Sequence, residues 1–165
     1  MKYLFVSYFS LLLLTGCVKR PSKDPVPSIE FIDFKTENSS IAKASFLIEY
    51  QDGDGNLFSP EENPTPNFIC SFFYYNKLTG NFDPFITKVI FPDGSSLTDT
   101  FRITTSVRNP KDLDLSKKPI KGSIYIPLTQ FRSSDTIKIF KYKMFMVDRA
   151  GNKSNIITTP SYTIN

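Results

Sequence analysis

Hydrophobic and polar residues alternate along much of the chain from Ile29 onward, and this alternation predicts β-strands. The clearest case is residues 40–52, where apolar residues occupy every second position and most residues between them are polar. Side chains of a strand alternate between its two faces, so one face of this strand is expected to be buried. That face comprises Ala42, Ala44, Phe46, Ile48 and Tyr50.

Other segments continue the strand pattern. Residues 122–128 alternate in the same way, and residues 68–75 are apolar on both faces, which is typical of a central strand. Residues 76–81 supply a turn, so we expect residues 84–91 to return as the hairpin partner of the central strand. Three more strands are predicted over residues 100–107, 136–147 and 156–164. The alternation slips near Ile139 and Phe140, which predicts a β-bulge.

The spacing of these strands predicts the fold class. No segment combines a sustained 3.6-residue apolar repeat with helix caps. Seven or eight strands separated by turns, within one domain over residues 29–165, predict an all-β protein with an antiparallel β-sandwich. A β-barrel is the alternative, because the pattern alone does not separate the two.

The N-terminus follows a different pattern. Lys2 precedes an apolar run over residues 4–14, and Thr15, Gly16 and Cys17 follow it. A positive start, an apolar centre and small residues form the layout of an export signal. The run is too short for the alternative, an uncleaved transmembrane helix, which needs about 20 apolar residues.

Residues 14–17 resemble the lipobox of bacterial lipoproteins. The resemblance implies that signal residues 1–16 are removed and that Cys17 becomes a lipidated N-terminus. Residues 17–28 contain three prolines among polar residues and predict a flexible tether. We therefore expect a lipid-anchored protein of the cell envelope, on the outer membrane, with its periplasmic or surface face left open.

The second cysteine, Cys70, is predicted to be structural. It lies in the apolar sequence Phe-Ile-Cys-Ser-Phe-Phe, where a lone cysteine is typically a small buried hydrophobic residue. With Cys17 acylated, no internal disulfide is expected.

The composition argues against an enzyme. The chain has no histidine, the usual general base and zinc ligand. It also has no nucleophile elbow, phosphate-binding loop or dinucleotide fingerprint. A carboxylate pair for glycoside hydrolysis is the remaining option, with Glu61–Glu62 or Asp52–Asp54 as candidates. The net charge of +4 is scattered, and an exported protein is not expected to meet nucleic acid.

Two segments together resemble one family. Residues 50–57 contain Asp-Gly-Asp-Gly-Asn, and residues 147–155 contain Asp-Arg-Ala-Gly-Asn before the last strand. The pair resembles small Ig-like (fibronectin-III-like) lipoproteins of the Bacteroidota. The resemblance implies an Ig-like sandwich of about seven strands with a binding or scaffolding role, and it brings no catalytic residues.

The first of these segments is also a candidate ion site. Asp52, Asp54 and Asn56 alternate with glycines, so their oxygens could face one point as in a calcium loop. It is not an EF-hand, because Leu57 and Asn63 stand where Gly and Glu are required.

Topology extends the candidate site to the second segment. In an Ig-like sandwich the loop after the second strand and the final hairpin lie at the same end. The candidate calcium ligands are therefore Asp52, Asp54, Asn56, Asp148, Asn152 and Asn155. Turn chemistry is the alternative, since Asp, Asn and Gly favour turns without any metal. Calcium is the one cofactor considered, because an all-oxygen ligand set favours it over zinc or copper.

These features predict a membrane-anchored envelope lipoprotein whose Ig-like domain is a binding, scaffolding or accessory subunit of an envelope complex. The expected partners are the membrane, through the lipid on Cys17, and an envelope protein. An envelope glycan or lipopolysaccharide-binding protein is the alternative. Lys138, Lys141 and Lys143 could form a basic strip for anionic polymers, although such lysines also solvate strands and prevent edge-to-edge pairing.

Overall fold

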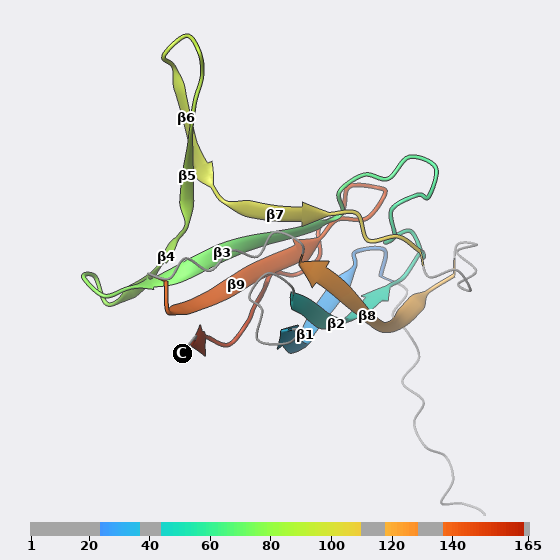
Figure 1. Cartoon of the computed structure of the whole chain (residues 1–165). Coiled ribbons are helices and arrows are strands. Elements are labelled where there is room, and N and C mark those ends of the chain that lie inside the picture. Colours follow the sequence, from blue (N-terminus) through green and yellow to red (C-terminus); the bar gives the residue numbers. More distant parts are fainter. Residues whose placement is uncertain (1–23, 37–43, 110–117, 129–136, 164–165) are drawn as a thin grey trace, which may run out of the picture.

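The computed structural model describes residues 24–36, 44–109, 118–128 and 137–163, and these residues form an all-β structure (Figure 1). The predicted all-β class is confirmed. The strands are β1 (Ser28–Thr36), β2 (Ala44–Asp52), β3 (Phe68–Asn76), β4 (Asn81–Pro84), β5 (Ile86–Ile90), β6 (Ser96–Thr100), β7 (Arg102–Thr105), β8 (Ile120–Leu128), β9 (Ile139–Met146), β10 (Ile157–Thr158) and β11 (Tyr162–Thr163). Signal residues 1–16, Cys17 and the first part of the tether lie outside the described residues. Within the described part of the chain, no helix is long and apolar enough to cross a membrane.

Two antiparallel sheets face each other across an aromatic core. In the first, β2 lies between β1 and β8; in the second, β9 and β3 lie side by side at the centre (Figure 1). Phe46 of β2 meets Tyr142 of β9 edge to face, with ring centroids 5.0 Å apart, and lies 6.2 Å from the ring of Phe68 on β3. Aromatic side chains bury large apolar areas, so these contacts between the sheets are the main source of cohesion.

The alternating pattern correctly located the buried faces of the strands. On β2, Ala44, Phe46, Ile48 and Tyr50 are buried, the residues between them are partly exposed, and Asp52 at the strand end continues the buried face. Ala42 lies outside the described residues. The central place of residues 68–75 is also confirmed, since β3 pairs with β9 on one side and with β4 and β7 on the other.

Cys70 is a fully buried free thiol in the core, as expected. Burial raises the pKa of this thiol far above its ordinary value. Because the thiolate is the reactive form, Cys70 is chemically protected in the folded protein.

The predicted hairpin partner of the central strand, residues 84–91, is wrong in its position. The partner is β4, residues 81–84, which pairs from Asn76 opposite Asn81 to Phe73 opposite Pro84, and β5 leaves this sheet to pair with β6. The chain then rejoins the same edge of β3 through β7. The edge strand is thus interrupted by an inserted hairpin, whose base is closed by a hydrogen bond from Phe101 N to the Phe85 carbonyl, 2.7 Å.

Two further predictions near the C-terminus differ from the structure. The bulge expected at Ile139 and Phe140 is wrong, because β9 pairs with β3 in unbroken register from Phe140 to Met146. Apolar residues on both faces of β9 caused the apparent slip. The single closing strand is two short strands, β10 and β11, with Pro160 between them, and proline cannot donate a ladder hydrogen bond.

Candidate functional site

The loop that follows β2 is anchored in the core by its own apolar residues. Leu57 and Phe58 are both buried, and Phe58 packs edge to face against Tyr50 with centroids 5.1 Å apart. Gly55 permits the turn before them, since its φ is +75°, a value that favours glycine. These contacts fix the positions of Asp52, at the end of β2, and of Asp54.

The turn between β9 and β10 is braced by Asp148. Its two carboxylate oxygens accept hydrogen bonds from the backbone N and the side-chain Nδ2 of Asn152, each at 2.8 Å. Its own backbone N donates to the Asn152 carbonyl at 3.0 Å. Aspartate thus closes the turn as a side-chain acceptor, which is common turn chemistry.

The loop after β2 and the turn after β9 are in contact, in agreement with their predicted position at the same end of the domain. Arg149 donates from its backbone N (3.1 Å) and from its Nε (3.3 Å) to the carbonyl oxygen of Asn56. Asp148, the preceding residue, is thereby held next to the loop after β2.

Three carboxylates, Asp52, Asp54 and Asp148, gather at this junction, and we name them the acid cluster. One oxygen from each lies within 4.8 Å of the others. Asp52 and Asp148 are buried and Asp54 is partly buried. Burial, and then the neighbouring charge of Asp54, raise the pKa of the Asp52 carboxyl, while hydrogen bonds from backbone N–H groups partly offset this and Asp148 adds to it. The acid cluster is the group of described residues that could hold a metal ion.

The three asparagines of the predicted ligand set have different positions. Asn56 lies beside the acid cluster and donates from Nδ2 to Asp54 Oδ2 at 2.7 Å. Asn152 contacts the cluster through Asp148. Asn155 instead joins the first strand: its Oδ1 accepts from Ile29 N (2.8 Å) and its Nδ2 donates to the Ile29 carbonyl (2.9 Å).

The other polar candidates have less to support them. Glu61 and Glu62 are exposed in the loop, where they lack the burial that tunes a catalytic carboxyl. Lys141 lies over the ring of Phe82, 4.2 Å from Nζ to its centroid, and Lys143 over Phe73 at 4.9 Å. These lysines cover aromatic rings of their own sheet, a role that cation–π attraction favours.

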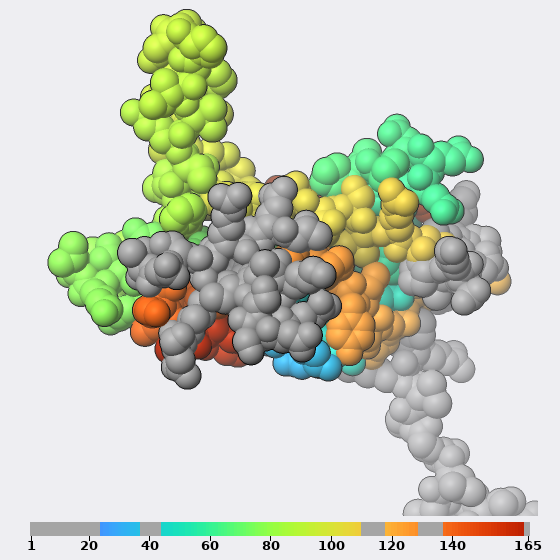
Figure 2. All heavy atoms as spheres, in the orientation of Figure 1, coloured from blue at the N-terminus to red at the C-terminus, as the bar shows by residue number. Residues whose placement is uncertain are grey.

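The hairpin formed by β5 and β6, residues 86–100, is a feature that the sequence analysis missed, and we name it the arm. It projects from the edge of the second sheet, and Figure 2 shows it standing clear of the neighbouring surface (Figure 1). In the described structure its two strands pair only with each other. Its exposed apolar residues are Ile86, Val89, Ile90 and Leu97, with Phe91 following β5.

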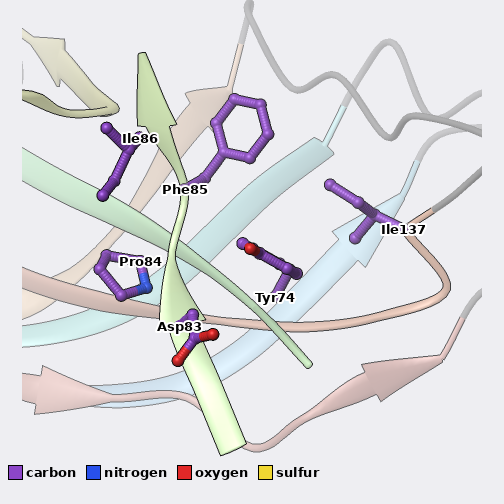
Figure 3. A pocket seen from close by; sticks show the side chains of 6 residues that line it. All are labelled: Tyr74, Asp83, Pro84, Phe85, Ile86 and Ile137. Atoms are coloured by element: carbon purple, nitrogen blue, oxygen red, sulfur yellow. The ribbon is translucent and has the colours of Figure 1, made fainter. Parts of the chain in front are cut away.

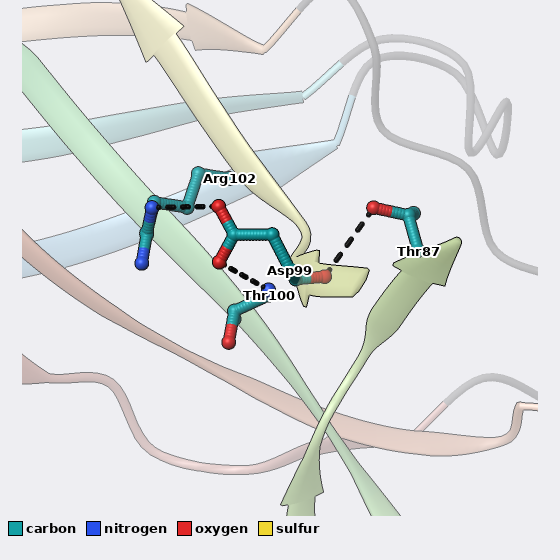
Figure 4. A network of polar contacts seen from close by, with 4 residues as sticks. All are labelled: Thr87, Asp99, Thr100 and Arg102. Atoms are coloured by element: carbon teal, nitrogen blue, oxygen red, sulfur yellow. Dashed lines mark hydrogen bonds and ion pairs between the residues drawn. The ribbon is translucent and has the colours of Figure 1, made fainter. Parts of the chain in front are cut away.

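Polar contacts hold the base of the arm (Figure 4). The Asp99 carboxylate accepts from Arg102 Nη1 at 3.1 Å and from the backbone N of Thr100 at 2.7 Å. The Asp99 carbonyl accepts from the Thr87 hydroxyl at 3.4 Å. The arm is therefore a defined continuation of the sheet edge.

A pocket lies beside the base of the arm (Figure 3). Its volume is about 510 Å³. It combines apolar side chains with one phenol and one carboxylate, and its lining residues are Tyr74, Asp83, Pro84, Phe85, Ile86 and Ile137. Asp83 accepts a hydrogen bond from Asn76 Nδ2 at 2.7 Å.

No protein-family model, curated protein or solved structure matches this chain.

Proposed function

We propose that this chain is a lipid-anchored protein of the bacterial cell envelope whose Ig-like domain binds an envelope protein through the arm. The anchor is Cys17, on the outer membrane, and the role is binding or scaffolding within an envelope complex rather than catalysis. The observation that carries the binding role is the exposure of large apolar residues on a hairpin that leaves the sheet.

The strand order supports an Ig-like sandwich. The order β1-β2-β8 corresponds to strands A, B and E of an Ig-like domain, and β10-β9-β3-β4 corresponds to G, F, C and C′. The arm is then inserted in the chain between C′ and E. Insertions of this kind fall on surface connections, where binding residues are often found.

The arm has the properties of a surface that a partner covers. Val89 and Leu97 pair across the two strands and are 51% and 56% exposed, while Ile90, which points to the opposite face, is 69% exposed. Isolated two-stranded hairpins are only marginally stable in water, and contiguous exposed apolar residues mark interaction sites. Each strand also has an unpaired outer edge within the described structure, to which a partner could add a strand.

Charge favours a protein over a lipid surface as the partner of the arm. The tip carries Asp93, which accepts hydrogen bonds from the backbone N and hydroxyl of Ser95. Over residues 86–100 the arm has one basic residue, Lys88, against two acidic ones, Asp93 and Asp99. Surfaces that bind anionic membranes instead combine apolar residues with basic ones.

A crosslinking experiment on the full-length protein in its native membrane tests this proposal. Val89→Thr with Leu97→Thr removes apolar surface from one face of the arm. Threonine is β-branched and favours strands, so the hairpin should still form. Ile156→Thr is the matched control, because Ile156 is 67% exposed but lies outside the arm. We expect wild type and the control to crosslink to one discrete protein, and the double variant to lose at least nine-tenths of that product. Equal crosslinking by all three proteins would contradict the proposal.

The pocket supports a second candidate, the binding of an envelope glycan. Tyr74 and Phe85 offer aromatic surface and Asp83 offers a hydrogen-bond acceptor, a combination suited to a neutral sugar more than to anionic lipopolysaccharide. Retention of the purified protein on an envelope polysaccharide column, lost on Asp83→Ala but kept in the arm variant, would favour this candidate.

A further inference from the structure

The acid cluster and the neighbouring Asn56 contain buried oxygens that accept no hydrogen bond. Asp52 Oδ1, Asp54 Oδ1 and Asn56 Oδ1 are all buried, and none has a partner. Asp52 is 1% exposed. Buried polar atoms are paired in nearly all native structures, and each exception calls for a physical explanation such as an ion. Three such atoms occur here within five positions of the chain.

Turn chemistry explains only the other polar atom of each side chain. Asp52 Oδ2 accepts from Leu57 N at 2.9 Å, and Asn56 Nδ2 donates to Asp54 Oδ2 at 2.7 Å. These bonds shape the loop. They leave Oδ1 of each residue buried without a hydrogen-bond partner. The hydrogen bonds of the turn therefore do not explain why the loop has two aspartates and an asparagine at these positions.

The two ion pairs found among the described residues lie outside the cluster. Lys35 pairs with Asp33, and Arg102 pairs with Asp99, so neither of these ion pairs involves the cluster. Arg149 is adjacent, yet its Nε donates to the Asn56 carbonyl rather than to a carboxylate. Buried carboxylates this close to one another are stable as anions only when a cation or several donors compensate them.

The size and chemistry of the cluster select the cation. Calcium takes oxygen ligands at about 2.3–2.6 Å, so two oxygens on opposite sides of the ion are about 5 Å apart. The 4.8 Å limit on the carboxylate oxygens fits inside such a shell. Magnesium instead demands a near-ideal octahedron of ligands at about 2.1 Å and usually keeps several waters, so four protein oxygens from two loops suit calcium better. The cluster offers no nitrogen or sulfur ligand, the types that favour zinc or copper.

We propose that Asp52, Asp54, Asn56 and Asp148 form a calcium site that ties the loop after β2 to the turn after β9. The ligand atoms are the three unpaired oxygens and one carboxylate oxygen of Asp148. Asn152 holds Asp148 through hydrogen bonds to both of its carboxylate oxygens, and Asn155 takes no part because its side chain is bonded to β1. The ion neutralises the cluster and fixes the end of the domain at which the two loops meet.

Equilibrium dialysis of the full-length protein in a non-ionic detergent, with radioactive calcium, tests this site. We expect one calcium ion per chain for wild type. Asp52→Asn with Asp54→Asn should lower the affinity at least tenfold, because asparagine keeps the acceptors for Leu57 N and Asn56 Nδ2 but removes two charges. Asp93→Asn is the matched control, since Asp93 also caps a turn but lies at the tip of the arm. It should leave binding unchanged.

Melting curves provide a second test, which compares the wild-type protein with and without calcium. Millimolar calcium should raise the melting temperature of wild type by several degrees relative to EDTA, and magnesium should raise it less. A ligand that binds only the folded state stabilises it in this way. In EDTA the double variant should melt at or above the wild-type temperature, because it relieves repulsion. Absence of calcium binding at millimolar concentration, or equal binding by the double variant, would overturn the site.

Discussion

At the scale of single residues, Asn67 shows how one buried amide can hold a long loop in place. Its Nδ2 donates to the carbonyls of Leu57 (2.9 Å) and Val107 (3.2 Å), and its Oδ1 accepts from Val107 N (2.6 Å). Asn67→Ala would leave the Leu57 carbonyl and the Val107 N–H without this partner, while the Val107 carbonyl still accepts from Ser59 N at 2.9 Å. Each buried group left unpaired costs about 1–3 kcal/mol. We expect a loss of about 3 kcal/mol in the free energy of unfolding, measured by urea denaturation. Asn81→Ala, at an exposed turn, should lose well under half of that.

Gly55 supports the geometry of the acid cluster in two ways that glycine alone allows. Its φ is +75°, and a Cβ atom placed on it would lie 2.5 Å from the backbone oxygen of Lys118. Gly151 has a similar φ of +87° but open space around it. Gly151→Ala should therefore cost about 1–2 kcal/mol, the left-handed penalty. Gly55→Ala should cost about 1–3 kcal/mol more, because the backbone must also move. Equal losses in urea denaturation would show that the contact with Lys118 relaxes freely.

At the scale of elements, the arm is expected to be separable from the fold. None of its residues belongs to the buried core, and Phe85 and Phe101 close its base by a backbone hydrogen bond. Replacing residues 86–100 with Asn-Gly, a two-residue hairpin turn, should change the melting temperature by no more than a few degrees. The same variant should lose the partner crosslink. A large drop in melting temperature would mean that the arm stabilises the sheet edge.

Local patterns predicted some elements well and missed others for a physical reason. Alternation identifies which residues of a strand face the core, so β2 and β8 were predicted with their buried faces. The apolar residues of β3 predicted only its central place. It does not identify the neighbour of a strand. Residues 84–91 are rich in β-branched and aromatic residues, a composition that fits a strand whether it pairs with β3 or with β6, so the arm was not predicted.

In the candidate site, too, the residues close in sequence were predictable from local pattern and the distant ones were not. Asp52, Asp54 and Asn56 are close in sequence, so their spacing alone predicted that they share one loop. Their meeting with Asp148 required the order of the strands, and the structure confirms that the two loops touch. Asn155 could not be placed in this way, because its partner Ile29 is 126 positions away.

At the scale of the whole molecule, stability should be independent of redox conditions. Cys70 is a buried free thiol, and its neighbours in the core are apolar or aromatic side chains. The melting temperature of the full-length protein should be the same with and without dithiothreitol, since no internal disulfide can be reduced. The thiol should react with a water-soluble reagent only after unfolding, because burial raises its pKa and excludes the reagent. A drop of several degrees with reductant would contradict this.

The anchor decides where the whole molecule acts, and the two cysteines provide a matched test of it. If Cys17 carries the lipid, Cys17→Ser should abolish labelling of the protein by an alkyne fatty acid in cells. Cys70→Ala should leave the labelling intact, although it costs stability through the cavity it creates. Acyl chains contribute about 0.8 kcal/mol per buried CH₂, so the unlabelled variant should leave the membrane fraction or remain unprocessed. Because the sandwich begins at β1, well after Cys17, the Cys17→Ser domain should keep the wild-type melting temperature. Labelling of Cys17→Ser at the wild-type level would overturn the lipobox interpretation, and with it the assignment of the arm to an envelope partner.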